Sequence, residues 1–163
     1  GVYKASRFLL GMWKDMQPEE FYSATPMDFQ VEQLTGVEIR QNGTVTGYRL
    51  DMVEALTENN KIATDEYGNV LWDVRVKKNE TETDAAAFLD WYVQLNRLPL
   101  SGRVKEGWQQ EGDALYEITV ETPVLTREIA FYSYDALHAV MTVDGTGLFY
   151  LEKTALSVLE ELP

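Results

Sequence analysis

The sequence predicts an α+β protein, in which antiparallel β-meanders carry two to three amphipathic helices packed on the sheet. Two observations support this prediction. Several short segments alternate apolar and polar residues and are joined by short turns, which favours antiparallel pairing because parallel strands need a long crossover. Three other segments repeat their apolar residues at helical spacing. The chain has 163 residues, the length of one domain, and 45% of them are apolar, which is enough for a core.

The first predicted elements are a strand at 2–5 and a helix that Ser6 can cap. The apolar residues of this helix form one stripe, made of Phe8, Leu9, Met12, Trp13 and Met16. The helix should end before Pro18, and a loop should follow to Gly36.

The next segments indicate β-structure. Strands at 37–40 and 47–53 flank Asn42-Gly43, the dipeptide most typical of a tight hairpin, because both residues tolerate positive φ. The segment 70–76 alternates strictly and predicts a strand with one face buried. The apolar members of that alternation are Val70, Trp72, Val74 and Val76.

The second half begins with a predicted helix from Asp84 to about Leu98, capped by Thr81 or Thr83 and ended by Pro99 and Gly102. Its inner face holds Ala85, Phe88, Leu89, Tyr92 and Leu95. Further strands are predicted at 114–122, 127–134, 138–143 and 148–152, the last two joined by a tight turn at 144–147. A final helix should start at Thr154 and bury Leu156, Leu159 and Leu162.

Composition excludes several function classes. The chain carries 27 acidic and 14 basic residues, a net charge of −13, which argues against nucleic-acid binding and against docking on anionic lipid. Without cysteine it can form no disulfide, thiolate nucleophile, zinc knuckle or iron–sulfur cluster. The longest apolar run, 8–13, has six residues, so we expect membrane attachment only through a segment absent from this chain. A single leading glycine is typical of a cleaved tag and indicates a piece of a longer protein.

Catalytic signatures are absent from the sequence. His138 is the one histidine, and the strand pattern around it indicates a structural role rather than a metal ligand. Asp144-Gly145-Thr146-Gly147 is interpreted as a hairpin and not as an aspartic-protease motif, and 65–69 as a turn and not as a calcium loop. We therefore predict no catalytic residue, no metal, no cofactor and no enzymatic activity.

Aromatic residues provide the candidate binding site. Four of them, Trp91, Trp108, Tyr132 and Tyr134, would form an interaction patch if they cluster at the surface. Packing in the core is the alternative interpretation of the same four residues.

The two ends of the sequence suggest a repeat. Val2-Tyr3 followed by Phe8-Leu9 matches Phe149-Tyr150 followed by Ala155-Leu156 at identical spacing. This match divides the chain into 1–35, the tail of a preceding unit, and 36–163, one complete unit, within one compact body.

A family resemblance follows from the complete unit. Its succession of elements includes Val37-Glu38-Ile39, Trp72-Asp73-Val74, Leu95-Asn96-Arg97-Leu98, Val143-Asp144-Gly145 and Phe149-Tyr150-Leu151. This succession resembles a bacterial family catalogued as domain of unknown function 4340. The resemblance implies an extracytoplasmic protein, anchored to the cell membrane in its full-length form and associated with transporter components, with no established catalytic residues.

Two functional hypotheses follow. The first is a non-enzymatic extracytoplasmic binding or assembly module, accessory to an ABC-type transporter, whose partners are proteins of the cell envelope and which works through sheet edges and exposed aromatic residues. The alternative is a carbohydrate-binding or carbohydrate-active envelope protein, which requires an aromatic ring beside two carboxylates in a concave groove.

Overall fold

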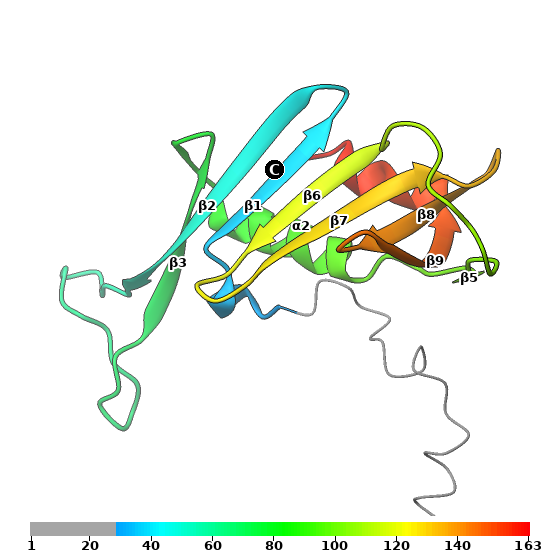
Figure 1. Ribbon diagram of the computed structural model, residues 1–163. Coiled ribbons are helices and arrows are strands. Elements are labelled where there is room, and N and C mark those ends of the chain that lie inside the picture. The colour runs from blue at the N-terminus through cyan, green and yellow to red at the C-terminus, as the bar shows by residue number, and fades with distance from the viewer. Residues whose placement is uncertain (1–28) are drawn as a thin grey trace, which may run out of the picture.

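The computed structural model describes residues 29–163, which form one nine-stranded antiparallel sheet in the order β4-β3-β2-β1-β6-β7-β8-β9-β5 (Figure 1). The strands are β1 (Gly36–Gln41), β2 (Thr44–Glu54), β3 (Trp72–Lys78), β4 (Thr81–Thr83), β5 (Gly102–Arg103), β6 (Tyr116–Glu121), β7 (Thr126–Ser133), β8 (His138–Val143) and β9 (Thr146–Glu152). The helices are η2 (Val31–Gln33), α2 (Ala85–Asn96) and η3 (Lys153–Leu159). The strand expected at 2–5, the helix from Ser6, and most of the expected tail unit lie outside the described residues.

The α+β prediction is wrong, because the described part of the chain is mostly β, with α2 as its one α-helix. The segment expected to form a final α-helix is the 3-10 helix η3. Leu156, Leu159 and Leu162 recur every three residues, which suits the three residues per turn of a 3-10 helix better than the 3.6 of an α-helix. Leu156 and Leu159 are buried as expected.

Both tight hairpins are confirmed. Asn42 and Gly43 join β1 to β2 with φ of 49° and 78°, and Asp144 and Gly145 join β8 to β9 with φ of 50° and 79°. All four residues are in the left-handed region that a two-residue hairpin turn requires. These turns set the register on either side and hence which side chains share a face.

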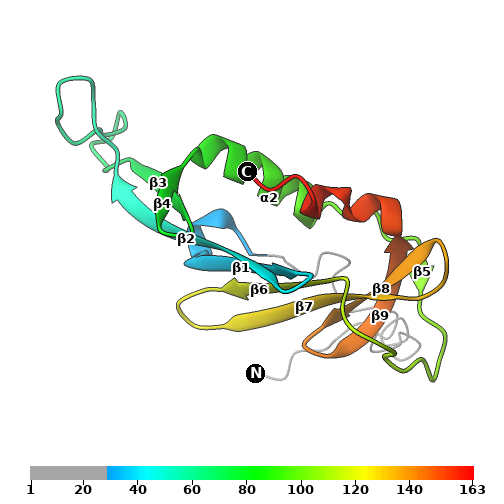
Figure 2. The same ribbon diagram turned by 90° about the horizontal axis from the view of Figure 1, so that it is seen from above.

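The helical layer covers one face of the sheet (Figure 2). The helix predicted at 84–98 is confirmed as α2, although its cap is Asp84 and not a threonine: Asp84 Oδ1 accepts from the backbone N–H groups of Ala86 and Ala87 at 2.9 and 3.3 Å. Phe88 of α2 is fully buried, with its ring 5.0 Å from that of Tyr48 on β2.

Polar contacts hold the residues that follow η3 against β2 and β3. Tyr48 Oη and Lys78 Nζ both donate to the carbonyl oxygen of Pro163, at 2.8 and 2.6 Å. Burial raises the pKa of Tyr48 to about 12, so this hydroxyl stays a donor. The chain after η3 is thereby held over β2 and β3.

Candidate functional site

Trp91, one of the four predicted binding residues, lies in the core. Only 4% of it is exposed, and its ring lies 5.5 Å from that of Phe88 and 5.7 Å from that of Tyr48. Its indole N–H donates to the carbonyl oxygen of Val158 in η3 at 2.8 Å. Trp91 therefore joins α2 to η3 on the helical side of the sheet and does not lie beside the other three residues.

Trp108 and Tyr132 do come together, on the other face of the sheet. Their rings lie 6.5 Å apart, and Trp108 approaches Gly147 so closely that a Cβ added at Gly147 would lie 2.7 Å from the indole ring. Tyr132 is 9% exposed, so little of its ring is open to a ligand. Trp108, from the loop between β5 and β6, thus covers part of β8 and β9.

Tyr134 lies beyond the end of β7 and belongs to a neighbouring group. Its ring stacks on Tyr150 at 5.4 Å, and the His138 imidazole meets the same Tyr150 ring edge-on at 5.1 Å. Because Tyr150 pairs with Val140, which pairs with Tyr132, these aromatic residues share one sheet face. Three of the four predicted residues therefore lie on the face that the helices do not cover.

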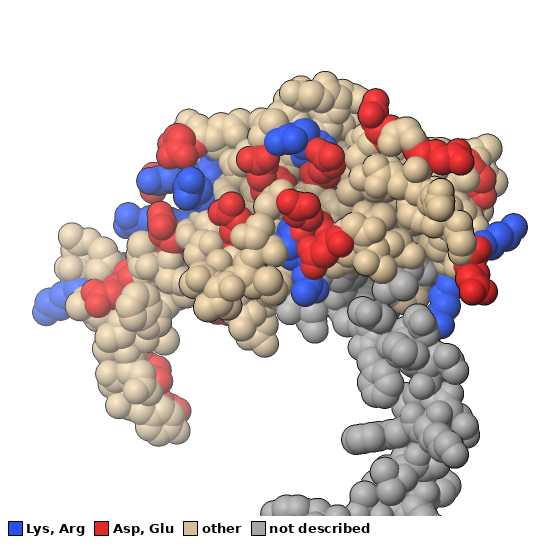
Figure 3. Space-filling model, viewed as in Figure 1, with Lys and Arg blue, Asp and Glu red and all other residues tan. Residues whose placement is uncertain are grey.

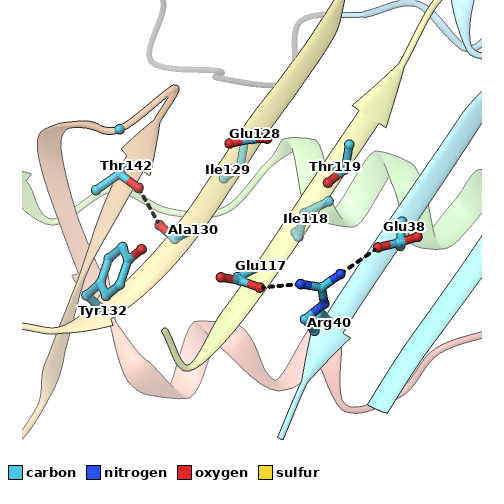
Figure 4. Close-up of a pocket in the computed structure, with 11 residues that line it drawn as sticks. Glu38, Arg40, Glu117, Ile118, Thr119, Glu128, Ile129, Ala130, Tyr132 and Thr142 are labelled. Carbon is cyan, nitrogen blue, oxygen red and sulfur yellow. Dashed lines mark hydrogen bonds and ion pairs between the residues drawn. The ribbon is translucent and has the colours of Figure 1, made fainter. Parts of the chain in front are cut away.

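A shallow hollow of about 270 Å³ lies beside Tyr132 on this face (Figure 4). Arg40 lies between two carboxylates there, with nitrogen–oxygen distances of 3.4 Å to Glu38 and 3.6 Å to Glu117. Burial, and then the negative charge of Glu117, raise the pKa of Tyr132, which keeps its hydroxyl a hydrogen-bond donor. Because the ion-paired side chains are about half exposed, these contacts contribute little stability.

Gly147 provides a test of how firmly Trp108 is held. Gly147→Ala should displace the indole and lower the free energy of unfolding by about 1–3 kcal/mol, because the added methyl group overlaps the ring. Chemical denaturation measures the loss, and the indole N–H resonance of Trp108 reports the displacement. In a Trp108→Ala background the same substitution should cost clearly less. An equal cost in both backgrounds would show that Trp108 is not what Gly147 accommodates.

The His138 side chain closes the turn between β7 and β8. Its Nδ1 lies 2.9 Å from the Asp135 carboxylate, which also accepts from the backbone N–H groups of Leu137 at 2.8 Å and His138 at 2.7 Å. The hydrogen bond from His138 is the main cause that lowers the pKa of Asp135. Lys153 Nζ donates to Ser133 Oγ at 2.8 Å and to the Asp135 carbonyl oxygen at 2.7 Å. The side chains of Ser133, Asp135, His138 and Lys153 therefore form a polar network that stabilises this turn.

Among residues 29–163, the largest group of exposed apolar side chains lies outside the predicted binding residues. It lies on the arm, which we define as residues 51–75: the end of β2, the loop that follows and the start of β3. Seven of the twelve exposed large apolar side chains of the described residues belong to it. They are Met52, Leu56, Ile62, Tyr67, Val70, Leu71 and Trp72. Tyr67 is 82% exposed and Trp72 is 56% exposed.

The arm projects beyond the helical layer, as Figures 1 and 2 both show. α2 packs on β2 near Tyr48, where the Phe88 and Tyr48 rings lie 5.0 Å apart. Beyond this crossing, β2 and β3 continue along their own length to Glu54 and Trp72, where their large apolar side chains are exposed. Leu50 and Val76, a cross-strand pair, are still buried. In the next pair on the same face, Val74 is half-buried and Met52 is exposed, and beyond Val74 on β3 Trp72 is exposed as well.

The arm keeps its shape through backbone hydrogen bonds rather than through packing. The N–H of Ala55 donates to the carbonyl oxygen of Leu71 at 2.9 Å, that of Ala63 to Ala55 at 2.7 Å, and that of Leu71 to Ala63 at 2.9 Å. Asp65 closes one end turn by accepting from the N–H groups of Tyr67 and Asn69, both at 2.9 Å. The exposed apolar side chains are thus displayed on an ordered backbone.

The alternation at 70–76 was the one signal for this surface, and its interpretation as a strand with one buried face was wrong in part. The strand is displaced to Trp72–Lys78, and of the four apolar residues Val76 alone is fully buried. Alternation predicts that side chains share a face, but it does not say whether another element covers that face. Space-filling atoms in Figure 3 show the arm as a projection of mostly uncharged surface.

Comparison with protein-family models, with curated proteins and with solved structures finds no match to this chain. The family resemblance accordingly stays a prediction. Residues 29–163 contain no helix long and apolar enough to cross a membrane and no group of three or more metal-ligating side chains. Within residues 29–163, the fold is mostly β, the helices lie on one face of the sheet only, and one apolar arm is exposed.

Proposed function

We propose that this chain is a binding and assembly module that holds a protein partner of the cell envelope on its arm. The observation that carries the proposal is the concentration of exposed apolar side chains between Met52 and Trp72. Soluble domains rarely display such a surface unless another molecule covers it. Tryptophan and methionine are also enriched where proteins meet.

The charge of the arm indicates which kind of partner surface would fit it. Residues 51–75 contain six acidic and two basic residues, so the apolar side chains stand in a negative surround. A partner with an apolar contact surface and a basic rim fits both properties. The extracytoplasmic setting, the anchored parent protein and the transporter subunit as partner rest on the family resemblance, and they form part of the same proposal.

The test is site-specific photo-crosslinking in the source cell, with the chain expressed as part of its full-length parent. A photoreactive phenylalanine derivative at Trp72 should form an adduct with one protein, which mass spectrometry identifies. The same derivative at Val124 is the matched control, because Val124 is equally apolar and 93% exposed but lies on the β6–β7 hairpin. No adduct at Trp72, adducts with lipid alone, or the same adducts at both positions would refute the proposal.

Carbohydrate binding is the second candidate function, and one observation favours it. In the hollow of Figure 4 an aromatic residue, Tyr132, lies near the carboxylate of Glu117, and Glu128 lines the same hollow four residues away along β7. Tyr132 is only 9% exposed, and the half-buried Trp108, whose ring lies 6.5 Å from that of Tyr132, lines a neighbouring hollow in which a sugar would stack on the indole. Titration with cell-wall oligosaccharides, followed through the indole N–H resonance of Trp108, distinguishes this candidate from docking on the arm.

A further inference from the structure

The edge of the sheet on the arm side is only half covered. β4 pairs with Val76, Lys77 and Lys78 of β3, and the pairing ends there. From Trp72 to Arg75, β3 pairs with β2 on one side, and none of the described strands lies on its other side. An edge of this kind offers backbone hydrogen-bonding groups to an additional strand.

The register shows which groups are offered. Two hydrogen bonds, from Ala55 N–H to the Leu71 carbonyl at 2.9 Å and from Asn79 N–H to the Gly47 carbonyl at 2.8 Å, flank the ladder between β2 and β3. In an antiparallel ladder, the backbone groups of successive residues point alternately toward the partner strand and away from it. Because Leu71 and Asn79 form their hydrogen bonds on the β2 side, the N–H and C=O groups of Asp73 and Arg75 also point toward β2. The corresponding groups of Trp72 and Val74 therefore point outward.

The same two residues carry the apolar side chains of the edge. Trp72 and Val74 lie on the helical side of the sheet, where Val74 packs partly against the core and Trp72 is exposed, whereas Asp73 lies on the other face. Arg75 already stands opposite Asp51 in the register, but Asp73 stands opposite Val53 and so lacks a cross-strand cation. An added strand would thus contact the apolar side chains of Trp72 and Val74 on one face of the sheet and the Asp73 carboxylate on the other face.

Charge disfavours a second copy of this chain at the edge. In the register that pairs Trp72 of one copy with Val74 of another, the two Asp73 carboxylates stand directly opposite each other, an arrangement that destabilises a sheet. The net charge of −13 on each copy adds repulsion. The occupant is consequently a different molecule, with positive charge.

We infer that the partner adds a β-strand to the Trp72–Arg75 edge of β3, using an extended segment in which apolar residues alternate with lysine or arginine. The inference rests on the proposed docking function of the arm and specifies how the docking occurs. Backbone hydrogen bonds to Trp72 and Val74 supply the register, the apolar residues of the added strand cover the side chains of Trp72 and Val74, and a basic residue lies opposite Asp73.

Amide hydrogen exchange with a model peptide tests this inference. The probe is a nine-residue peptide of alternating lysine and valine, added to the full chain to saturation. Exchange at the Trp72 and Val74 amides should slow by about tenfold or more, because these groups gain hydrogen bonds. The amides of Asp73 and Arg75 are internal controls and should change little, since they already bond to β2.

Three comparisons make the result decisive. A valine–glutamate peptide of the same length should bind clearly more weakly, and Asp73→Lys should reverse this preference. A lysine–valine peptide N-methylated at its central valines should lose binding. Peptide binding without slower exchange at Trp72 and Val74, equal binding of both peptides, or no binding at all would each overturn strand addition. The crosslinking experiment at Trp72 decides the docking function separately, since it needs no particular backbone geometry.

Discussion

Phe88→Ala is expected to lower the free energy of unfolding by about 3–5 kcal/mol, the largest effect of any single substitution considered for this protein. Phe88 is fully buried at the centre of the aromatic core, with ring centroids 5.0 Å from Tyr48, 5.5 Å from Trp91 and 6.2 Å from Tyr92. Its removal leaves a cavity between α2 and the sheet that large rings refill poorly. Urea denaturation followed by circular dichroism measures the change.

Val93→Ala is the matched control, because Val93 lies on the same helix but is 42% exposed. It should change the free energy of unfolding by no more than about 0.5 kcal/mol. A loss below about 1 kcal/mol for Phe88→Ala would contradict the placement of α2 over β2.

Trp72→Ala is expected to weaken binding of the partner by about 30-fold or more, which corresponds to about 2 kcal/mol, while stability changes little. Trp72 is the largest side chain of the arm that lies on a strand, and 56% of it is exposed. Large aromatic residues at the centre of an interface typically contribute most of its affinity. Isothermal titration with the partner identified by crosslinking gives the change in Kd.

Leu137→Ala is the control for this prediction, since Leu137 is 71% exposed in the turn between β7 and β8, away from the arm. The affinity of the Leu137→Ala variant for the partner should stay within about twofold of the affinity of the unsubstituted chain. Equal losses for Trp72→Ala and Leu137→Ala would indicate binding that does not depend on the arm.

The candidate site could be predicted only in part from the sequence. Trp108, Tyr132 and Tyr134 do lie on one sheet face, but Trp91 lies in the core beneath the other face. The sequence offers no signal for this separation, because Trp91 stands at the edge of its helical stripe and the orientation of α2 depends on contacts with distant strands. The arm was missed for a related reason: its residues have the pattern of a half-buried strand.

Local chemistry alone determined seven of the nine strands, with β3 displaced by two residues, and the two tight turns, whereas the short strands β4 and β5 were not predicted. Asn42-Gly43 and Asp144-Gly145 accept positive φ wherever they occur, and an alternating segment favours a strand whatever surrounds it. The mostly-β class, the 3-10 form of η3 and the exposure of Trp72 were decided only by the tertiary structure. The physical reason is that burial depends on what packs against a face: α2 packs over Tyr48, and β2 and β3 extend past it to the exposed Met52 and Trp72.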